Sequence, residues 1–477
     1  MNKLSALQPN NVFAYFEEIC NIPHGSSNLN AICGYCEEFA KKNNFRYIRD
    51  KANNIVIFKN GTNGSQSPVI LQAHLDMVCQ KTDESQIDFE KDGLDIFIDG
   101  DYIRAKDTTL GADNGIGVAM IMAILADDKL LHPPIEAVFS ADEEIGMIGA
   151  AALDTSILKG KRMINLDSEE SDLITVSCAG GNDVRIYVPI TRETKKGTRL
   201  TVKINGLKGG HSGIDIDKNR ENANILMGRI LNHIQESDFN IISIDGGTKR
   251  NAIPFKTDAQ ILVGNAKDTC VRIKEYAKLI VEELCDAEET LKITVNEQDV
   301  GEYEVLDKNS GEKIVYMLLN TPNGIVKMSE SIQGLVETSL NLGITSTQKD
   351  SVLLQYALRS NKKTALEFLE ERMKSFSLYN GGTIEISGRY EPWEYKEESA
   401  LRDEYALAYE RKTGKKPKVD AIHAGLECAV FSSTIKNLDC IAIGPDTLDA
   451  HTTNERLDIK STKKVYELLC ETLEMLS

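Results

Sequence analysis

Five short segments of the chain contain acidic and histidine side chains of the kind that bind divalent metal ions in proteins. The segments ILQAHLDMV, LGADNGIG, FSADEEIG, MINLDSEE and DAHTTNERL supply His74, Asp113, Glu144, Asp167 and His451 as candidate ligands. A pair of divalent ions about 3.5–4 Å apart that share a bridging ligand can divide a nucleophilic attack between them. Buried carboxylates also need a positive partner, which a divalent ion provides. The segments therefore predict a metalloenzyme with a two-ion centre.

Two further acidic residues adjoin these candidates. His74 and Asp76 are separated by one residue, so on an extended strand both side chains face the same side. The Asp76 carboxylate could then fix the tautomer of the imidazole. Glu143 and Glu144 are adjacent; if one binds metal, the other remains free to carry a proton to and from a metal-bound water.

Each segment alone also has an ordinary structural interpretation. An HxD pair is commonly a surface pair or a helix cap, and an EE pair is commonly solvated. Asp113 and Asp167 could form turns or helix caps, and His451 could be a loop residue. The joint occurrence of five such segments, several at the ends of apolar runs, favours the metal centre.

The elements that must position these residues can be read from the apolar pattern. Three candidate segments follow β-branched runs typical of buried parallel strands: SPVILQA, PIEAVFS and KRMINL. The apolar helix GIGVAMIMAILAD begins immediately after Asp113 and Asn114. Because ligands bind at the carboxyl ends of strands in open α/β sheets, the side chains should converge in one crevice. We predict a doubly wound α/β catalytic domain.

A different pattern without metal-type residues at strand ends begins near residue 186. It is a repeat of the order βαββαβ, with copies at 199–297 and 302–387. From residue 393 the first pattern returns and includes His451. We therefore predict a catalytic domain formed by residues 1–185 and 393–477, with an inserted α+β domain at 186–392.

Composition excludes several classes of protein. The net charge of −18 disfavours nucleic acid and anionic membranes as partners. No apolar run approaches the ~20 residues of a membrane helix. The first twenty residues lack the apolar stretch of a signal peptide, so a cytoplasmic location is expected. Cys33 and Cys36 form a CxxC without a second pair, so a redox or structural zinc role is not expected there.

Several longer motifs carry a family resemblance over nearly the whole chain. They are HLDMVCQK, TTLGADNGIGVA, SADEEIGMIGA, NLDSEE, CAGG, LKGGHSGIDI, KRNAIP and HAGLECAVF. In order and spacing they resemble the di-zinc metallopeptidases that include carnosinase and aminoacylase. The resemblance implies a zinc-exopeptidase-type fold in which the inserted domain is a lid.

The resemblance also implies roles for the acidic cluster. Asp113 would bridge both ions, and the Asp113–Asn114 peptide bond would be cis. One site would be completed by His74 and Asp167, and the other by Glu144 and His451. Glu143 would act as general base and Asp76 would orient His74. The ions are expected to be zinc, although cobalt and manganese accept the same nitrogen and oxygen ligands.

In the lid, the resemblance assigns His211 to the carbonyl oxygen of the substrate and Asn251 and Arg359 to substrate binding. A guanidinium suits a terminal carboxylate because its fork binds both oxygens. His423 is a candidate for substrate binding or, with Glu427, for supporting the metal ligands. Relatives place a lid histidine in a partner's site, so a homodimer is one expectation. The duplicated lid offers an alternative in which a monomer suffices.

The implied reaction is hydrolysis of dipeptides with a free amino terminus, of Xaa-His type or broad specificity, by a metal-bridging hydroxide. Two alternatives stay open. One is an amidohydrolase of the same family acting on N-acyl amino acids. The other is a catalytically silent relative that binds peptides.

Overall fold

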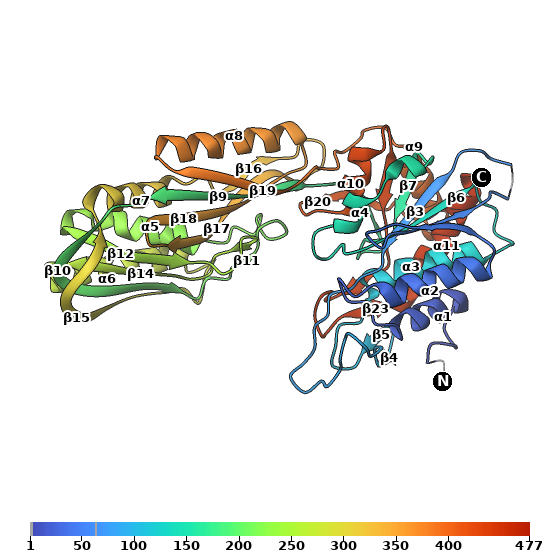
Figure 1. Ribbon diagram of the computed structural model, residues 1–477, viewed down its shortest axis with the longest axis horizontal. Helices are drawn as coiled ribbons and strands as arrows, with labels where there is room; N and C mark the ends of the chain where they lie inside the picture. Colours follow the sequence, from blue (N-terminus) through green and yellow to red (C-terminus); the bar gives the residue numbers. More distant parts are fainter. Residues whose placement is uncertain (1–2, 63) are drawn as a thin grey trace. The chain divides into compact units, whose positions relative to one another are not determined.

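The computed structural model describes residues 3–62 and 64–477, which form two compact units (Figure 1). Unit 1 contains the chain up to Cys178 together with Trp393–Ala421 and Leu426–Ser477, and unit 2 contains Ala179–Pro392 and Ile422–Gly425. The sequence placed the first boundary after residue 185. It lies earlier because β9 (Gly180–Pro189) pairs along its length with strands of unit 2.

Unit 1 is built on an eight-stranded sheet of order β1-β2-β6-β3-β7-β21-β8-β20. The strands are β1 (Arg46–Arg49), β2 (Ile55–Lys59), β3 (Val69–His74), β6 (Ile135–Ser140), β7 (Arg162–Asn165), β8 (Leu173–Cys178), β20 (Lys418–Ile422) and β21 (Asp439–Ala442). In the centre, β6, β3, β7 and β21 are parallel neighbours. The three apolar runs that the sequence predicted as parallel strands are therefore confirmed, and their carboxyl ends lie at one edge.

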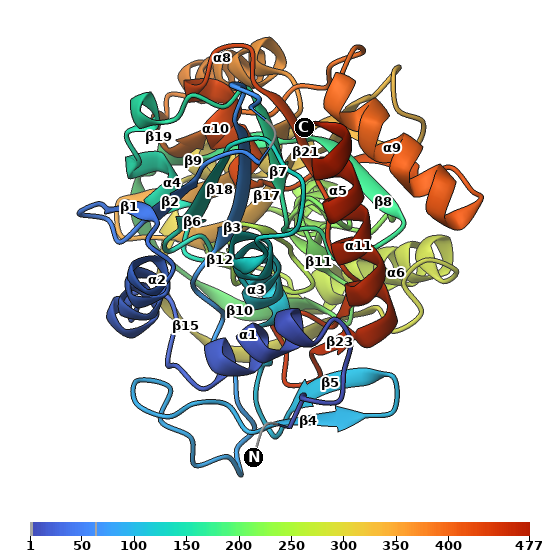
Figure 2. The ribbon, with the colours of Figure 1, turned by 90° about the vertical axis from the view of Figure 1, so that its right-hand side faces the viewer.

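The helices of unit 1 cover this sheet. They are α1 (Asn10–Cys20), α2 (Asn30–Lys42), α3 (Ala112–Ala126), α4 (Ile148–Ala152), α9 (Ala400–Thr413), α10 (Glu427–Thr434) and α11 (Ile459–Met475). Helix α3 is apolar on all sides because it packs between β3 and α1 (Figure 2). A small second sheet joins β4 (Ile96–Asp99), β5 (Tyr102–Ala105), β23 (Arg456–Asp458) and β22 (Thr447–Leu448).

Unit 2 has a nine-stranded sheet with helices packed against it (Figure 1). Its path β15-β10-β14-β12-β17-β18-β9-β19 uses β9, β10 (Arg192–Asn205), β12 (Phe239–Gly246), β14 (Thr257–Val263), β15 (Lys292–Leu306), β17 (Val336–Thr347), β18 (Ser351–Ser360) and β19 (Thr383–Tyr390), while β16 (Gly324–Met328) pairs with β17. The helices are α5 (Ala223–His233), α6 (Ala266–Leu284), α7 (Lys308–Asn320) and α8 (Lys363–Tyr379). A separate two-stranded antiparallel sheet pairs β11 (Gly210–His211) with β13 (Ala252–Ile253), which follows α5 and β12 in the chain.

The two halves of this sheet repeat one strand order, but the second half is assembled differently from the prediction. The first half is β10-α5-β12-β14-α6-β15, as predicted. Residues 302–306 of the segment predicted to begin the second copy instead continue β15, which pairs with β10 past a bulge between Thr198 and Leu200, and Asp307 caps α7. The first strand of the second copy is β9, which lies between β18 and β19 as β10 lies between β14 and β15. The first copy is thus inserted within the second.

The structure also describes the state of the cysteines and whether any helix could span a membrane. All ten cysteines are free, and Cys33 and Cys36 are buried in α2. Among the described residues, no helix combines the length and apolarity needed to span a membrane.

Candidate metal and anion sites

The predicted metal ligands of unit 1 meet at the carboxyl edge of its parallel strands. His74 ends β3, Asp167 follows β7, Glu144 follows β6, Asp113 opens α3, and His451 lies in the turn between β22 and β23. His74, Asp113 and Glu144 each offer a ligand atom within 4.8 Å of the others. The strand topology therefore brings together side chains that are far apart in sequence.

The two carboxylate oxygens of Asp113 face two different histidines. Oδ1 lies 3.0 Å from Nε2 of His74, which is also 3.3 Å from Oδ1 of Asp167. Oδ2 lies 3.0 Å from Nε2 of His451, which is also 2.9 Å from Oε1 of Glu144. The five residues thus form two sets that share Asp113.

These distances fit metal binding. Nitrogen and oxygen ligands lie about 2.0–2.2 Å from zinc, so neighbouring ligand atoms around one ion are about 3 Å apart. Each set offers one imidazole nitrogen and two carboxylates, a donor set that suits divalent transition metals. The chemistry and spacing of the residues therefore fit two divalent ions on either side of Asp113.

Electrostatics also favours cations here. Hydrogen bonds to Asp113 and Glu144 raise the pKa of His451 to about 11. Burial alone would lower the pKa of His74, but Asp167 and Asp113 raise it well above its usual range. Burial raises the pKa of Asp167 to about 7. Bound cations would replace the protons on the imidazoles and compensate the carboxylates.

The start of α3 is shaped for this centre. Gly111 has the left-handed conformation (φ 67°), and the Asp113–Asn114 peptide is cis, as the family resemblance implied. Nδ2 of Asn114 donates to Oδ1 of Asp167 at 2.6 Å. Gly117 leaves room for this contact, because a Cβ there would lie 2.1 Å from Oδ1 of Asn114.

Asp76 contacts more than His74. Nδ1 of His74 lies 2.9 Å from the main-chain oxygen of Asp76 and 3.6 Å from its carboxylate. The carboxylate accepts hydrogen bonds from the backbone N–H groups of Glu143 (2.9 Å) and Glu144 (3.2 Å) and from the hydroxyl of Ser26 (2.8 Å). Its side chain therefore holds the loop after β6, while its backbone orients the imidazole.

The surroundings of Glu143 raise the pKa of its carboxyl group, which suits this residue to proton transfer. Its pKa is raised well above the usual range by burial and by the nearby charges of Asp167 and Glu427, against the lowering effect of His74. A carboxyl group with a raised pKa can both accept and release a proton near neutral pH.

A buried polar network lies beneath the strand ends, and sequence reasoning did not identify most of it. Glu427, which is fully buried, accepts hydrogen bonds from Nε2 of Gln72 (2.5 Å) and Oγ of Ser140 (2.6 Å). Nδ2 of Asn165 donates to Oε1 of Gln72 at 2.6 Å. Polar residues inside otherwise apolar parallel strands were the available signal, because buried polar groups require partners.

Unit 2 contains a second cluster of predicted residues. Arg359 on β18 is 9% exposed; its Nη1 donates to the hydroxyl of Tyr390 (3.1 Å), and its Nη2 lies 3.4 Å from Nε2 of His211. Nε2 of His423 lies 2.8 Å from the hydroxyl of Ser339. Within residues 3–62 and 64–477, no carboxylate forms an ion pair with Arg359, and its Nε has no hydrogen-bond partner. The positive charge of the guanidinium is therefore not balanced by a contacting carboxylate of these residues.

The tautomer of His211 follows from its backbone contacts. Nδ1 accepts from the N–H groups of Gly213 (3.2 Å) and Ile214 (3.1 Å), so the proton of the neutral ring is on Nε2. Burial and the charge of Arg359 lower the pKa of His211 to about 4. Two donors, Nε2–H of His211 and Nη2 of Arg359, thus lie 3.4 Å apart, an arrangement that suits an anionic or carbonyl oxygen.

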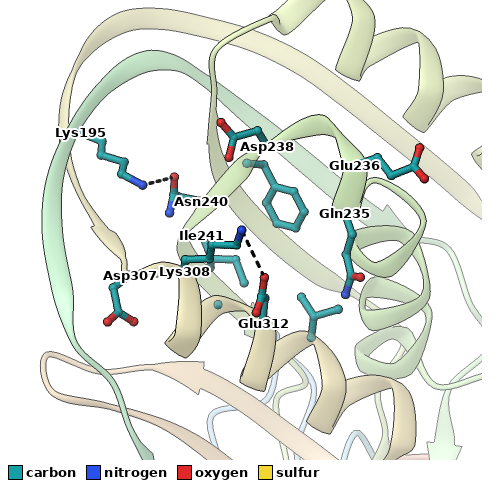
Figure 3. A pocket seen from close by; sticks show the side chains of 12 residues that line it. Lys195, Gln235, Glu236, Asp238, Asn240, Ile241, Asp307, Lys308 and Glu312 are labelled. Carbon is teal, nitrogen blue, oxygen red and sulfur yellow. Dashed lines mark hydrogen bonds and ion pairs between the residues drawn. The ribbon is translucent and has the colours of Figure 1, made fainter.

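The remaining predicted residues are also in unit 2. The main-chain oxygen of Asn251 accepts from the N–H of Ser212 at 2.9 Å, so Asn251 lies beside His211 where β11 pairs with β13. Burial and the charge of Arg359 lower the pKa of His423 to about 3. A separate polar hollow of about 470 Å³ between β10, β12 and α7 contains none of the predicted site residues (Figure 3).

Comparison with known proteins identifies a peptidase family and a dipeptidase that are similar to this chain. The model of Peptidase family M20/M25/M40 matches residues 70–475. The chain is 36% identical over 481 residues to the Cytosol non-specific dipeptidase of Escherichia coli (strain K12), and the match covers 99% of each protein. These findings confirm the resemblance that the motifs indicated.

Solved structures give the same result for the fold. The crystal structure of the aminoacylhistidine dipeptidase from Vibrio alginolyticus is similar with a TM-score of 0.91 and 35% identity, covering 99% of this chain and 98% of that one. Human carnosine dipeptidase 1 shares the fold at a TM-score of 0.51 and 12% identity, over 98% and 99% of the two chains. The predicted mixed α/β peptidase fold is therefore confirmed.

Proposed function

Because the chain belongs to Peptidase family M20/M25/M40, we propose that it is a metal-dependent dipeptidase acting on dipeptides with a free amino terminus. The names of its two relatives at 36% and 35% identity support this substrate class. One is called a non-specific dipeptidase and the other an aminoacylhistidine dipeptidase, so the proposal covers both broad and Xaa-His specificity. The cytosolic relative likewise supports a cytoplasmic location.

The observation that carries the proposal is the shared carboxylate of Asp113, each oxygen of which lies 3.0 Å from a different histidine. We assign His74 and Asp167 to one divalent ion and Glu144 and His451 to the other, with Asp113 common to both. When bound, such ions polarise the peptide carbonyl and acidify water at neutral pH. Zinc is the proposed native metal.

The protein's own groups perform the proton transfers and hold the substrate. Glu143 accepts a proton from the attacking water as its oxygen bonds to the peptide carbon, and delivers that proton to the amine when the C–N bond breaks. Nε2–H of His211 donates to the carbonyl oxygen as negative charge develops. Arg359 binds the terminal carboxylate, and Asn251 and His423 complete the substrate contacts.

The test is hydrolysis of a dipeptide panel that includes β-Ala-His, other Xaa-His dipeptides, dipeptides without histidine, and N-acetylated controls. Each is assayed before chelation, after chelation, and after zinc is restored. We expect metal-restored cleavage of the free-amine dipeptides alone. The relative rates then separate Xaa-His from broad specificity.

The same panel separates the alternatives. Cleavage of only the N-acetylated compounds would replace the proposal with an N-acyl amino acid amidohydrolase. Binding of dipeptides without cleavage of any compound would identify a silent peptide-binding protein. A complete catalytic set argues against the silent alternative, because Glu143 and all five metal-type residues are present.

A further inference from the structure

Glu455 holds the loop that carries Asp113, although it lies far from that loop in sequence. The residue is 3% exposed, and its carboxylate accepts hydrogen bonds from four consecutive backbone N–H groups. The donors are Leu110 (2.7 Å), Gly111 (3.1 Å), Ala112 (2.9 Å) and Asp113 (3.4 Å). These amides include the start of α3, where N–H groups lack partners within the helix. One side chain thus fixes the whole approach to Asp113.

The same glutamate belongs to the turn that carries His451. His451 has a left-handed backbone (φ 63°), and its side chain is 48% exposed, so packing alone does not hold it. The turn is closed by hydrogen bonds from the N–H of Thr452 to the oxygen of Asp449 (3.3 Å) and from the N–H of Glu455 to the oxygen of Thr452 (3.1 Å). Glu455 therefore joins the turn of His451 to the loop of Asp113.

We propose that Glu455 is a positioning residue that sets the separation of Asp113 and His451, and so the affinity of the Asp113–Glu144–His451 site for its ion. The inference rests on the proposed two-ion centre. Asp113 serves both ions, but the other two ligands of the first site, His74 and Asp167, lie at the ends of β3 and β7. The second site takes both Asp113 and His451 from the segments that Glu455 joins. Loss of Glu455 should therefore weaken one ion much more than the other.

Unit 1 offers a matched control in Glu136 on β6. Its carboxylate is 4% exposed and accepts hydrogen bonds from the N–H groups of Lys159 (2.9 Å) and Gly160 (2.9 Å). The segment that contains these two donors carries none of the five proposed metal ligands. Glu136→Gln removes the same charge from a similar environment and reports the general cost of such a change.

The experiment titrates metal-free protein with Co²⁺ and follows the visible absorption of each bound ion together with calorimetry. Wild type should bind two ions in distinguishable steps. In Glu455→Gln the amide NH₂ must face some of the four N–H donors. We therefore expect the affinity for the ion at the Asp113–Glu144–His451 site to fall about tenfold or more, the range typical for residues that support metal ligands. The affinity for the ion at the site of His74 and Asp167 should change by less than threefold. Glu136→Gln should bind both ions as wild type does.

The outcomes separate this inference from the proposed function. Failure of wild type to bind two ions would contradict the two-ion centre itself. If wild type binds two ions, unchanged binding by Glu455→Gln, or equal weakening of both ions, overturns the positioning role. If Glu455→Gln does not fold by circular dichroism, Glu455→Asp decides the question. This variant keeps the charge but shortens the side chain by one carbon, so it should still selectively lower the affinity of the Asp113–Glu144–His451 site. Metal binding equal to that of wild type would overturn the inference.

Discussion

Arg359 is a buried cation for which no acidic side chain of the described residues provides an ion pair. Its Nη2 lies 3.4 Å from Nε2 of His211, so one oxygen could accept hydrogen bonds from both groups. A dipeptide carries a terminal carboxylate that could fill this role. The guanidinium is thus the group whose removal most directly tests how the substrate is held.

Arg359→Met should raise KM for dipeptides about 30-fold or more with a smaller effect on kcat. Leaving one member of a buried charge pair without its partner costs about 2 kcal/mol or more. Steady-state kinetics with a dipeptide and its C-terminal amide would measure this, since the amide lacks the charge and should lose little. The exposed Arg372→Met is the control. An effect on kcat alone would show that Arg359 does not bind the carboxylate.

Glu143→Gln should retain both metal ions and lose about 10²–10⁴-fold in kcat, the usual contribution of a general base. The amide has nearly the same shape but cannot accept the proton. Kinetics and metal analysis on the same preparation would check both statements, with the exposed Glu398→Gln as control. Near-normal turnover would remove Glu143 from the mechanism.

His423 should make the protein less stable in acid. Its pKa is about 3 in the folded chain and 6.5 in the unfolded chain, so between these values only the unfolded chain binds the proton. Stability therefore rises with pH across this window, by up to about 1.4 kcal/mol per pH unit. His423→Asn should reduce the loss in unfolding free energy between pH 6.5 and 4.5 by about 2–3 kcal/mol. Urea unfolding followed by circular dichroism would measure it; identical pH dependence would contradict the argument.

Sequence reasoning found the metal-type residues because their side-chain chemistry is visible in the one-letter code. It did not reveal that the Asp76 carboxylate holds the backbone of Glu143 and Glu144, nor that Glu455 holds the loop of Asp113. In both cases the partners are main-chain N–H groups, which every residue except proline carries. Only the path of the folded chain determines which amides meet a given carboxylate.

At the level of elements, α3 must lie close to the strand end that carries Asp167. The contact depends on the absence of a side chain at Gly117, where a Cβ would lie 2.1 Å from Oδ1 of Asn114 and 2.8 Å from the main-chain oxygen of Leu166. By contrast, a Cβ at Gly115 would meet its nearest neighbours at 3.4 Å. A Cβ can therefore be accommodated at Gly115 but not at Gly117 without displacement of neighbouring atoms.

Gly117→Ala should displace Asn114 from Asp167 and reduce metal affinity and activity by about tenfold or more. Gly115→Ala should fold and bind metal much as wild type, because its contacts are of ordinary length. Calorimetric metal titration and dipeptide hydrolysis of both variants would decide. Equal behaviour of the two alanine variants would show that the packing of α3 at this point does not control the centre.

The strands that the sequence misassigned are those whose partners are distant in the chain. β15 continues through residues 302–306 because β10 is long enough to pair with it on both sides of a bulge. β9 looks like a continuation of the catalytic domain, yet it pairs with β18 and β19. Apolar alternation predicts that a strand exists, but it does not identify the neighbours to which that strand donates hydrogen bonds.

At the level of the whole molecule, the division into two units was visible as a change of pattern, but the assignment of His423 was not. Ile422–Gly425 belongs to unit 2 although both flanking segments belong to unit 1. The N–H of Ala179 bonds to the main-chain oxygens of Ile422 and Ala424, both at 3.1 Å, which fixes this segment at the start of unit 2. Such an exchange of a few residues leaves no compositional signal.

One chain contains every residue that the proposed reaction requires. His211 lies in β11, within the first copy of the repeat, and Arg359 lies in β18, in the second copy; their side chains are 3.4 Å apart within a single chain. We therefore predict that a monomer is fully active. Specific activity should stay constant when zinc-loaded protein is diluted from micromolar to low nanomolar concentration.

The dilution series must be matched by a measurement of oligomeric state, such as sedimentation velocity with fluorescence detection over the same concentrations. A constant specific activity across a dimer-to-monomer transition would establish that the partner is dispensable. A fall in activity that follows dissociation, and that excess zinc does not reverse, would contradict the prediction. It would mean that a second chain supplies a group to the reaction, because the contacts within one chain, including the His211–Arg359 pair, would then be insufficient for catalysis.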